Sequence, residues 1–235
     1  MEIGRDILAV YGRTGAFARA LPHIFAIPIA IELLRLGIMR SVVVSPGWHW
    51  SFTALATVGI ACVMVPAFRW WRFGEDRGRL WRLSWRVLLG VVAMLAIQLT
   101  DQKLFMMAGH LAADIAGSGR PFFVMSAQLL WLFVSVPLFP WYVAMMSDDP
   151  LTLRQSFAAI RPRWFRGFAV VLGSLVPLLL LGGLLRGLLN NPLNGWAGDT
   201  AFWLAAAING LLIAAVTLVT DATYFAVYRM ARPAD

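Results

Sequence analysis

The hydrophobic residues of this 235-residue chain lie in long runs separated by short polar stretches. A helix of roughly 20 residues crosses the hydrocarbon core of a bilayer, which is about 30 Å thick. Six runs approach that length, and we expect each of them to be a transmembrane helix. They cover residues 21–38, 51–71, 85–99, 121–146, 167–189 and 201–230. The pattern therefore predicts an all-α, polytopic membrane protein.

The composition agrees with this prediction. Hydrophobic residues make up 60% of the chain and charged residues 14%, and the mean hydropathy is +0.73. Soluble domains contain roughly 45–50% apolar and about 25% charged residues. Six spans with short loops use the whole length, so we expect a single integral membrane domain over residues 1–235. No room remains for a soluble catalytic domain.

The basic residues predict the orientation of the chain. The net charge is +8 and the isoelectric point about 10.9. With six spans, fifteen of the twenty Lys and Arg residues fall on one side of the membrane. Short loops that are rich in Arg stay in the cytoplasm. Both termini are thus predicted to be cytoplasmic, and the charge predicts anionic lipid rather than nucleic acid as the partner.

Two further features of the sequence predict the origin of the protein and how its N-terminus is anchored. Nineteen of the twenty basic residues are arginine and one is Lys103, a bias typical of a bacterial genome. Residues 1–20 lack the apolar core and small-residue cleavage site of a signal peptide. We therefore expect the first span to act as an uncleaved anchor in a bacterial inner membrane.

Two segments of the chain have similar sequences. Residues 65–71 read VPAFRWW and residues 136–142 read VPLFPWY, and an acidic pair follows each segment. Arginine-rich stretches with apolar residues three to four apart come next, at 78–89 and 155–168, and residues 15–28 have the same character. We interpret these as three hairpin repeats at about 1–77, 78–150 and 151–235, each led by a cytoplasmic amphipathic helix on the membrane surface.

The arginines of these amphipathic helices are the predicted contacts to lipid headgroups. An interfacial helix buries its apolar face and leaves arginine at the level of the phosphates. The predicted contacts are Arg79, Arg82, Arg86, Arg161, Arg163 and Arg166. Docking of a soluble partner on these arginines and on the acidic pairs is the alternative. Asp148 and Asp149 are interpreted as a helix cap, with Pro150 at the first helical position.

Polar residues within the spans are the candidate functional site. Ionisable side chains in a bilayer are costly and mark pathways or pairs between helices. The candidates are Glu32, Arg35, Gln98, Asp101, Gln128, Asn209 and Asp221. One interpretation is a water-filled cavity in which Glu32 and Asp221 bind ions or protons. The other, which we favour, is that these groups satisfy one another between helices and set the packing register.

No metal, cofactor or catalytic site is predicted. His110 and Asp114 are four residues apart, but a metal needs at least three convergent ligands, and His23 and His49 lie elsewhere along the chain. The sequence contains no HExxH, GxSxG, Walker or GxGxxG motif. Gly183 and Gly187 form a small-xxx-small pair that permits close helix contact, within the bundle or with a second copy of the chain.

Residues 149–181, DPLTLRQSFAAIRPRWFRGFAVVLGSLVPLLLL, combine a short loop, an amphipathic helix and a hydrophobic run. Together with the repeated hairpins, this segment resembles bacterial six-span membrane proteins similar to the membrane domain of some glycerophosphodiester phosphodiesterases. The phosphodiesterase domain is absent, so the resemblance implies no catalysis. It implies an integral membrane protein concerned with lipids or with upkeep of the envelope.

Two functions remain open at this point. The first is a non-enzymatic membrane module that organises lipid or a membrane-protein partner through its cytoplasmic helices. The second is a small-solute or ion transporter that uses Glu32, Arg35 and Asp221.

Overall fold

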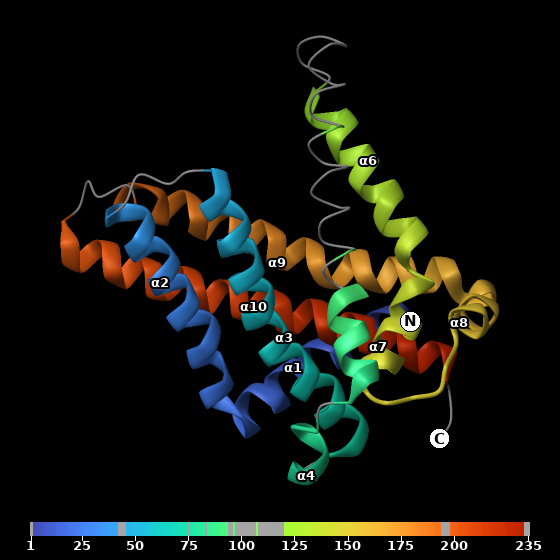
Figure 1. Ribbon diagram of the computed structural model, residues 1–235. Helices are drawn as coiled ribbons and strands as arrows, with labels where there is room; N and C mark the ends of the chain where they lie inside the picture. Colours follow the sequence, from blue (N-terminus) through green and yellow to red (C-terminus); the bar gives the residue numbers. More distant parts are fainter. Residues whose placement is uncertain are drawn as a thin grey trace. The chain divides into compact units, whose positions relative to one another are not determined.

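The computed structural model describes residues 2–41, 46–74, 76–82, 84–93, 96, 107, 120–193 and 198–232, and these are helices and turns without a strand (Figure 1). The longer helices are α1 (Glu2–Ala20), α2 (Ala26–Ser41), α3 (Pro46–Phe73), α6 (Arg120–Ser135), α9 (Trp164–Leu193) and α10 (Asp199–Ala231). The shorter ones are η1 (Pro22–Phe25), α4 (Arg77–Leu80), α7 (Leu138–Met146), α8 (Leu153–Ile160) and η3 (Arg161–Arg163). The all-α prediction is confirmed for these residues.

Several helices are long and apolar enough to cross a membrane. Among the described residues four qualify by themselves, and a fifth span arises if the bent pair Met125–Ser135 and Leu138–Met146 is counted as one. The four are Pro22–Arg40, Ala54–Phe73, Leu153–Leu185 and Asp199–Ala231. These five match five of the six predicted runs. In the remaining run, 85–99, residues 85–93 are helical and most of the others lie outside the described part of the chain.

The chain forms two compact units. Unit 1 comprises Met1–Arg82 and Val170–Ala226, and unit 2 comprises Leu83–Ala169 and Val227–Asp235. Helices α9 and α10 each contribute residues to both units because the unit boundaries fall within them. The three-repeat organisation, with boundaries near residues 77 and 150, remains a prediction.

The core of unit 1 lies where the N-terminal helices meet α3 and α10. Phe17, Ile24, Val63, Ala67 and Leu218 are each no more than 1% exposed and form one cluster. Burying a large apolar side chain stabilises a fold by about 1.5–3 kcal/mol in water. The cluster therefore packs α1 and η1 against the C-terminal half of α3.

Aromatic rings extend this core. The ring of Phe17 lies 5.8 Å from that of Trp70 and 5.9 Å from that of Trp71. The indole of Trp71 donates a hydrogen bond to the carbonyl of Arg13 at 3.3 Å. In unit 1 α1 is therefore a packed helix, with Val10 and Phe17 buried and most of its other side chains at the surface.

Helices α2 and α10 of unit 1 approach each other closely at Gly210. A Cβ atom at this position would lie 2.8 Å from the Cα of Ile29 and 3.2 Å from the Cβ of Glu32. Small residues allow the backbones of membrane helices to come together in this way. The approach brings the polar residue Asn209, next in sequence, against α2.

The helix break in unit 2 has an identifiable cause. Helices α6 and α7 are bent by 61° at a break between Ser135 and Leu138. Pro137 and Pro140 have no N–H, so two successive turns each lack a helical hydrogen bond. The carbonyl of Phe133, which Pro137 leaves without its helical donor, accepts a hydrogen bond from the indole of Trp164 at 2.7 Å.

A serine fills the next gap in the same bend. The hydroxyl of Ser156, on α8, donates to the carbonyl of Pro137 at 2.5 Å and accepts from the N–H of Trp141 at 3.2 Å. In an unbroken helix these two backbone groups would bond to each other. Side chains of α8 and α9 therefore satisfy the backbone groups that the bend releases, as membrane helices require.

Candidate functional site

The first buried polar cluster of unit 1 is centred on Glu32 of α2. Its carboxylate accepts a hydrogen bond from Arg35 Nε at 2.7 Å and a second from another nitrogen of that guanidinium at 2.6 Å. Asn209 of α10 donates its amide to the same carboxylate at 2.6 Å. Glu32 is 4% and Asn209 8% exposed, whereas the Arg35 side chain is 29% exposed.

This geometry joins α2 to α10 through hydrogen bonds. Residues three apart share a helix face, so the Glu32–Arg35 pair follows from their spacing. Three donors already bond to the Glu32 carboxylate. An ion pair whose hydrogen bonds are satisfied in this way does not require a ligand. The close approach at Gly210 then places Asn209 where it adds the third bond.

Asp221 lies on α10, as Asn209 does, but apart from this cluster. Twelve residues separate it from Asn209, which is about 18 Å along a helix axis. Asp221 is 3% exposed, and its Oδ2 atom has no hydrogen-bond partner among the described residues. Glu32 and Asp221 therefore do not belong to one polar cluster, and a cavity that uses both for ions or protons remains a prediction.

The threonines beside Asp221 bond within their own helix. Thr220 donates its hydroxyl proton to the carbonyl of Val216 at 2.8 Å, and Thr223 donates to that of Val219 at 2.7 Å. A hydroxyl has only one proton to donate. These two threonines therefore supply no donor to the carboxylate, and Asp221 differs from Glu32 in lacking a matched set of partners.

Of the other candidate polar residues, the structure describes only Gln128. Gln128 is exposed on α6 of unit 2. Gln98 and Asp101 lie outside the described residues, as do His110 and Asp114. Within the described part of the chain, no three His, Cys, Asp or Glu side chains gather in the manner of a metal site.

Unit 2 contains a buried acid whose role the sequence reasoning missed. The Asp149 carboxylate accepts hydrogen bonds from the hydroxyl of Tyr228, from Arg232 at 2.8 Å and from the N–H of Leu151 at 3.2 Å. Its carbonyl accepts a bond from Arg86 at 3.1 Å. Asp149 is 3% exposed, so it holds the end of α10 against the loop between α7 and α8.

The predicted helix cap at Asp148, Asp149 and Pro150 is wrong. Helix α8 begins at Leu153, and its N-cap is Thr152, whose hydroxyl accepts from the N–H of Gln155 at 3.3 Å. The Gln155 side chain in turn accepts from the N–H of Thr152 at 2.9 Å. This capping box is readable as a Thr-x-x-Gln pattern. Asp149 instead accepts hydrogen bonds from Tyr228 and Arg232, which are distant in sequence.

The six predicted headgroup arginines fall into different settings. In unit 2, Arg86 donates to the carbonyl of Asp149 and Arg163 to that of Met230. Carbonyls near a helix C-terminus lack intrahelical donors, so arginine fills a capping role at Met230. Arg166 is half-buried. Arg79, Arg82, Arg161 and Arg163 are exposed, and Arg163 is so although it also bonds to Met230.

Comparison with known proteins adds no functional assignment: no protein-family model, curated protein or solved structure matches this chain.

Proposed function

We propose that this chain is a non-enzymatic module of a bacterial inner membrane that organises anionic lipid through the arginine-bearing segments at its cytoplasmic side. The proposal includes six spans, three hairpin repeats, interfacial helices and cytoplasmic termini. It also retains the resemblance to the membrane domain of glycerophosphodiester phosphodiesterases, without their catalysis.

The observation that carries the proposal is the outward face of α8 together with the start of α9. Leu153 and Phe157, four residues apart on α8, are 41% and 40% exposed, and Phe165, in the first turn of α9, is 73% exposed. Arg154 and Arg161 beside them are exposed too. An apolar stripe bordered by arginines is the pattern of a helix at a membrane interface.

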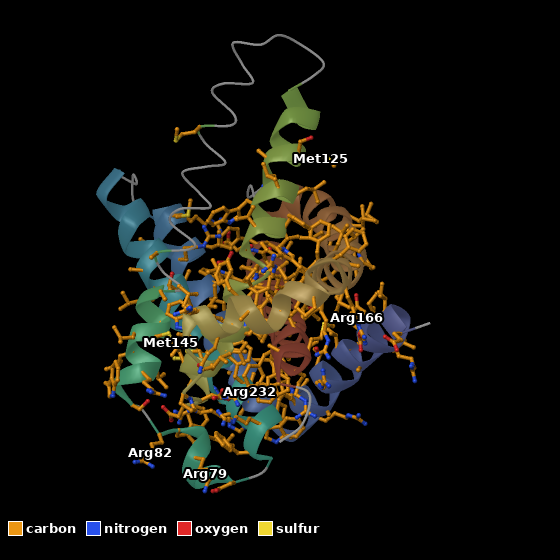
Figure 2. The ribbon with its side chains drawn as sticks, turned by 90° about the vertical axis from the view of Figure 1, so that its right-hand side faces the viewer. Arg79, Arg82, Met125, Met145, Arg166 and Arg232 are labelled. Carbon is orange, nitrogen blue, oxygen red and sulfur yellow. The ribbon has the colours of Figure 1, made fainter. Side chains whose placement is uncertain are left out.

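The opposite face of α8 supports the same interpretation. Ser156 and Ile160 are buried, so this helix already uses its other side to pack within unit 2. The exposed stripe is thus additional apolar surface. In unit 2, Arg232 near the end of α10 lies far from Met125 near the start of α6 (Figure 2).

Lipid-facing surface is also abundant on the candidate spans. Leu179, Leu180, Leu181 and Leu184 of α9 are between 53% and 71% exposed within unit 1. Exposed leucines at successive positions are costly in water and ordinary in a bilayer. These side chains support the membrane location on which the proposed function depends.

The test is the lipid preference of the purified chain in nanodiscs. We expect enrichment of phosphatidylglycerol over phosphatidylcholine around the protein when both lipids are supplied equally. The enrichment should weaken as salt is raised, because exposed charges are screened. Equal retention of the two lipids at every ionic strength would refute the module.

A transporter remains the second candidate, because Asp221 is a buried acid with an unpartnered oxygen. Intramembrane acids of this kind occur in proton and ion pathways. Proteoliposomes with an imposed pH or ion gradient distinguish the two functions. Decay of the gradient that is faster with the wild-type protein than in empty vesicles, and that returns to the empty-vesicle rate with Asp221→Asn, would favour transport.

Glu32→Gln, tested beside Asp221→Asn, gives a second way to distinguish the two functions. Under the proposed function, Glu32→Gln reduces the amount of folded protein because it weakens the contact of α2 with α10, while lipid preference of the remaining protein is unchanged. A folded Glu32→Gln protein that has lost ion flux would support the transporter instead.

A further inference from the structure

The turn that follows α3 in unit 1 begins at a glycine with a left-handed backbone conformation. We call residues 74–82 the α4 turn. Gly74 has a φ of +68°, and its N–H donates to the carbonyl of Trp70 at 2.9 Å. A left-handed glycine just after a helix ends it and redirects the chain. The chain turns back, so that the guanidinium of Arg79 lies 5.2 Å from the centre of the Phe73 ring.

A buried arginine holds this turn in place. Arg69, in the last turns of α3, is only 1% exposed. Its guanidinium donates to the carbonyl of Arg79 at 2.7 Å and to that of Arg82. The two carbonyls lie at and just beyond the end of α4, and Arg69 donates a hydrogen bond to each. The backbone that carries Arg79 and Arg82 is therefore anchored to the end of α3.

The α4 turn presents positive charge at its surface. The guanidinium of Arg72 lies 5.0 Å from the same Phe73 ring that Arg79 approaches. Residues 69–82 contain five arginines and two acids. One of the acids, Asp76, lies 3.1 Å from Arg79 Nε, and both side chains are more than half exposed. Arg72 at the end of α3 and Arg79 of the turn thus place like charges around one ring, an arrangement that an anion stabilises.

The surroundings of the turn point to a lipid anion. Trp81, between the two arginines, is 53% exposed. An exposed indole prefers the headgroup region of a bilayer. The candidate span Ala54–Phe73 leads directly into the turn. Figure 2 shows Arg79 and Arg82 at the outer edge of the turn.

We propose that the α4 turn binds the phosphate of one anionic phospholipid, with Arg79 and Arg82 as its ligands and Trp81 among the neighbouring headgroups. This inference rests on the proposed function and adds a defined site to it. Arg69 acts as the scaffold that keeps the two ligands together. Arginine suits the role because its planar guanidinium forms paired hydrogen bonds to phosphate oxygens.

The experiment counts tightly bound lipid. Full-length protein is exchanged into mild detergent, and native mass spectrometry follows a titration with phosphatidylglycerol. We expect one high-affinity lipid per chain. The double variant Arg79→Gln, Arg82→Gln should bind it roughly 30-fold more weakly, since each basic residue near anionic lipid contributes about a fivefold gain.

The matched control is Arg5→Gln, Arg229→Gln. It removes the same charge from exposed positions on α1 and α10. Neither arginine belongs to the α4 turn or to the apolar stripe of α8. The control should therefore keep the high-affinity lipid. Arg69 is left unchanged, because its loss would disturb folding as well as binding.

The outcomes separate this inference from the proposed function. If both double variants lose the lipid equally, or neither does, the α4 turn is not the site, while the nanodisc preference of the wild type still stands. If the wild type has no preference for anionic lipid, the proposed function fails first. Inorganic phosphate at millimolar concentration should not displace the lipid, and displacement would identify free phosphate as the ligand and overturn the assignment.

Discussion

The segments 65–71 and 136–142 have similar sequences but follow different backbone paths. Helix α3 passes through Pro66 without a break and continues to Phe73. At Pro137 the second segment is broken and bent by 61°. The fifth position of the motif is Arg69 in the first segment and Pro140 in the second. A single proline is tolerated in a membrane helix, and two prolines three residues apart remove bonds from consecutive turns.

The acidic residues after the two segments differ in the same way. The side chain of Asp76 is 51% exposed and pairs with Arg79 in its own turn. That of Asp149 is 2% exposed and pairs with Arg232, 83 residues away. Similar local sequences thus end in a surface turn in unit 1 and in a tertiary junction in unit 2. The burial and the partners of each acid, rather than the motif, therefore set its contribution to stability.

The substitution Asp149→Ala tests this contrast most strongly. It leaves Tyr228, Arg232 and the N–H of Leu151 without their acceptor in a buried site. We expect the free energy of unfolding to fall by about 3–5 kcal/mol, as when one partner of a buried ion pair is removed. Unfolding by SDS in mixed micelles measures the change. Asp149→Asn, which keeps one acceptor oxygen, should lose less, and a loss no larger than that of Asp76→Ala would refute the junction.

Ser156→Ala should have the next largest effect. The substitution leaves the carbonyl of Pro137 and the N–H of Trp141 unpaired at the bend. Each unsatisfied buried group costs about 1–3 kcal/mol. The same unfolding titration applies. Ser135→Ala is the matched control, because the hydroxyl of Ser135 bonds only to Leu132 in its own turn. Equal losses for the two serines would show that the bend needs no bridging hydroxyl.

Trp164→Phe is expected to cost less. The ring stacks on Phe133 at a centroid distance of 5.5 Å and an angle of 21°, and phenylalanine retains much of that contact. Only the indole hydrogen bond to the Phe133 carbonyl is lost, a change of about 0.5–1.5 kcal/mol. The exposed Trp85 provides the comparison, and Trp85→Phe should leave the unfolding free energy unchanged. Identical behaviour of the two variants would assign no role to the bond.

Asp76→Asn should have the smallest effect on stability. Both members of its pair with Arg79 are more than half exposed, so solvent screens the interaction. Surface ion pairs of this kind contribute less than about 1 kcal/mol. A measured loss comparable to that of Asp149→Ala would remove the distinction between the two acids. Repeating the titration at high salt should reduce even the small difference.

Sequence reasoning succeeded where neighbours along the chain decide the structure. The apolar runs indicated five of the helical spans because length and hydropathy suffice for membrane helices. The Glu32–Arg35 pair followed from a spacing of three. The capping box at Thr152 and Gln155 is equally local, although the predicted cap was the acidic pair that precedes it.

Sequence reasoning failed where the partner is distant. Nothing near Asp149 indicates that Tyr228 and Arg232, about eighty residues later, will enclose its carboxylate. The partner of Glu32 on α10 was equally hidden, because Asn209 reaches it only where Gly210 lets two backbones approach. Candidate arginines likewise resembled one another in sequence, yet Arg86 and Arg163 bond to backbone carbonyls of unit 2.

The sequence by itself determined that this chain is helical and that several of its helices suit a membrane, because hydropathy and helix geometry depend on contiguous residues. Only the tertiary structure decided which buried polar groups are satisfied. Glu32 and Asp149 have full sets of partners, whereas an oxygen of Asp221 has none among the described residues. The physical reason is that a hydrogen bond requires donor and acceptor within about 3 Å, and for residues far apart in sequence only the packing of helices sets that distance.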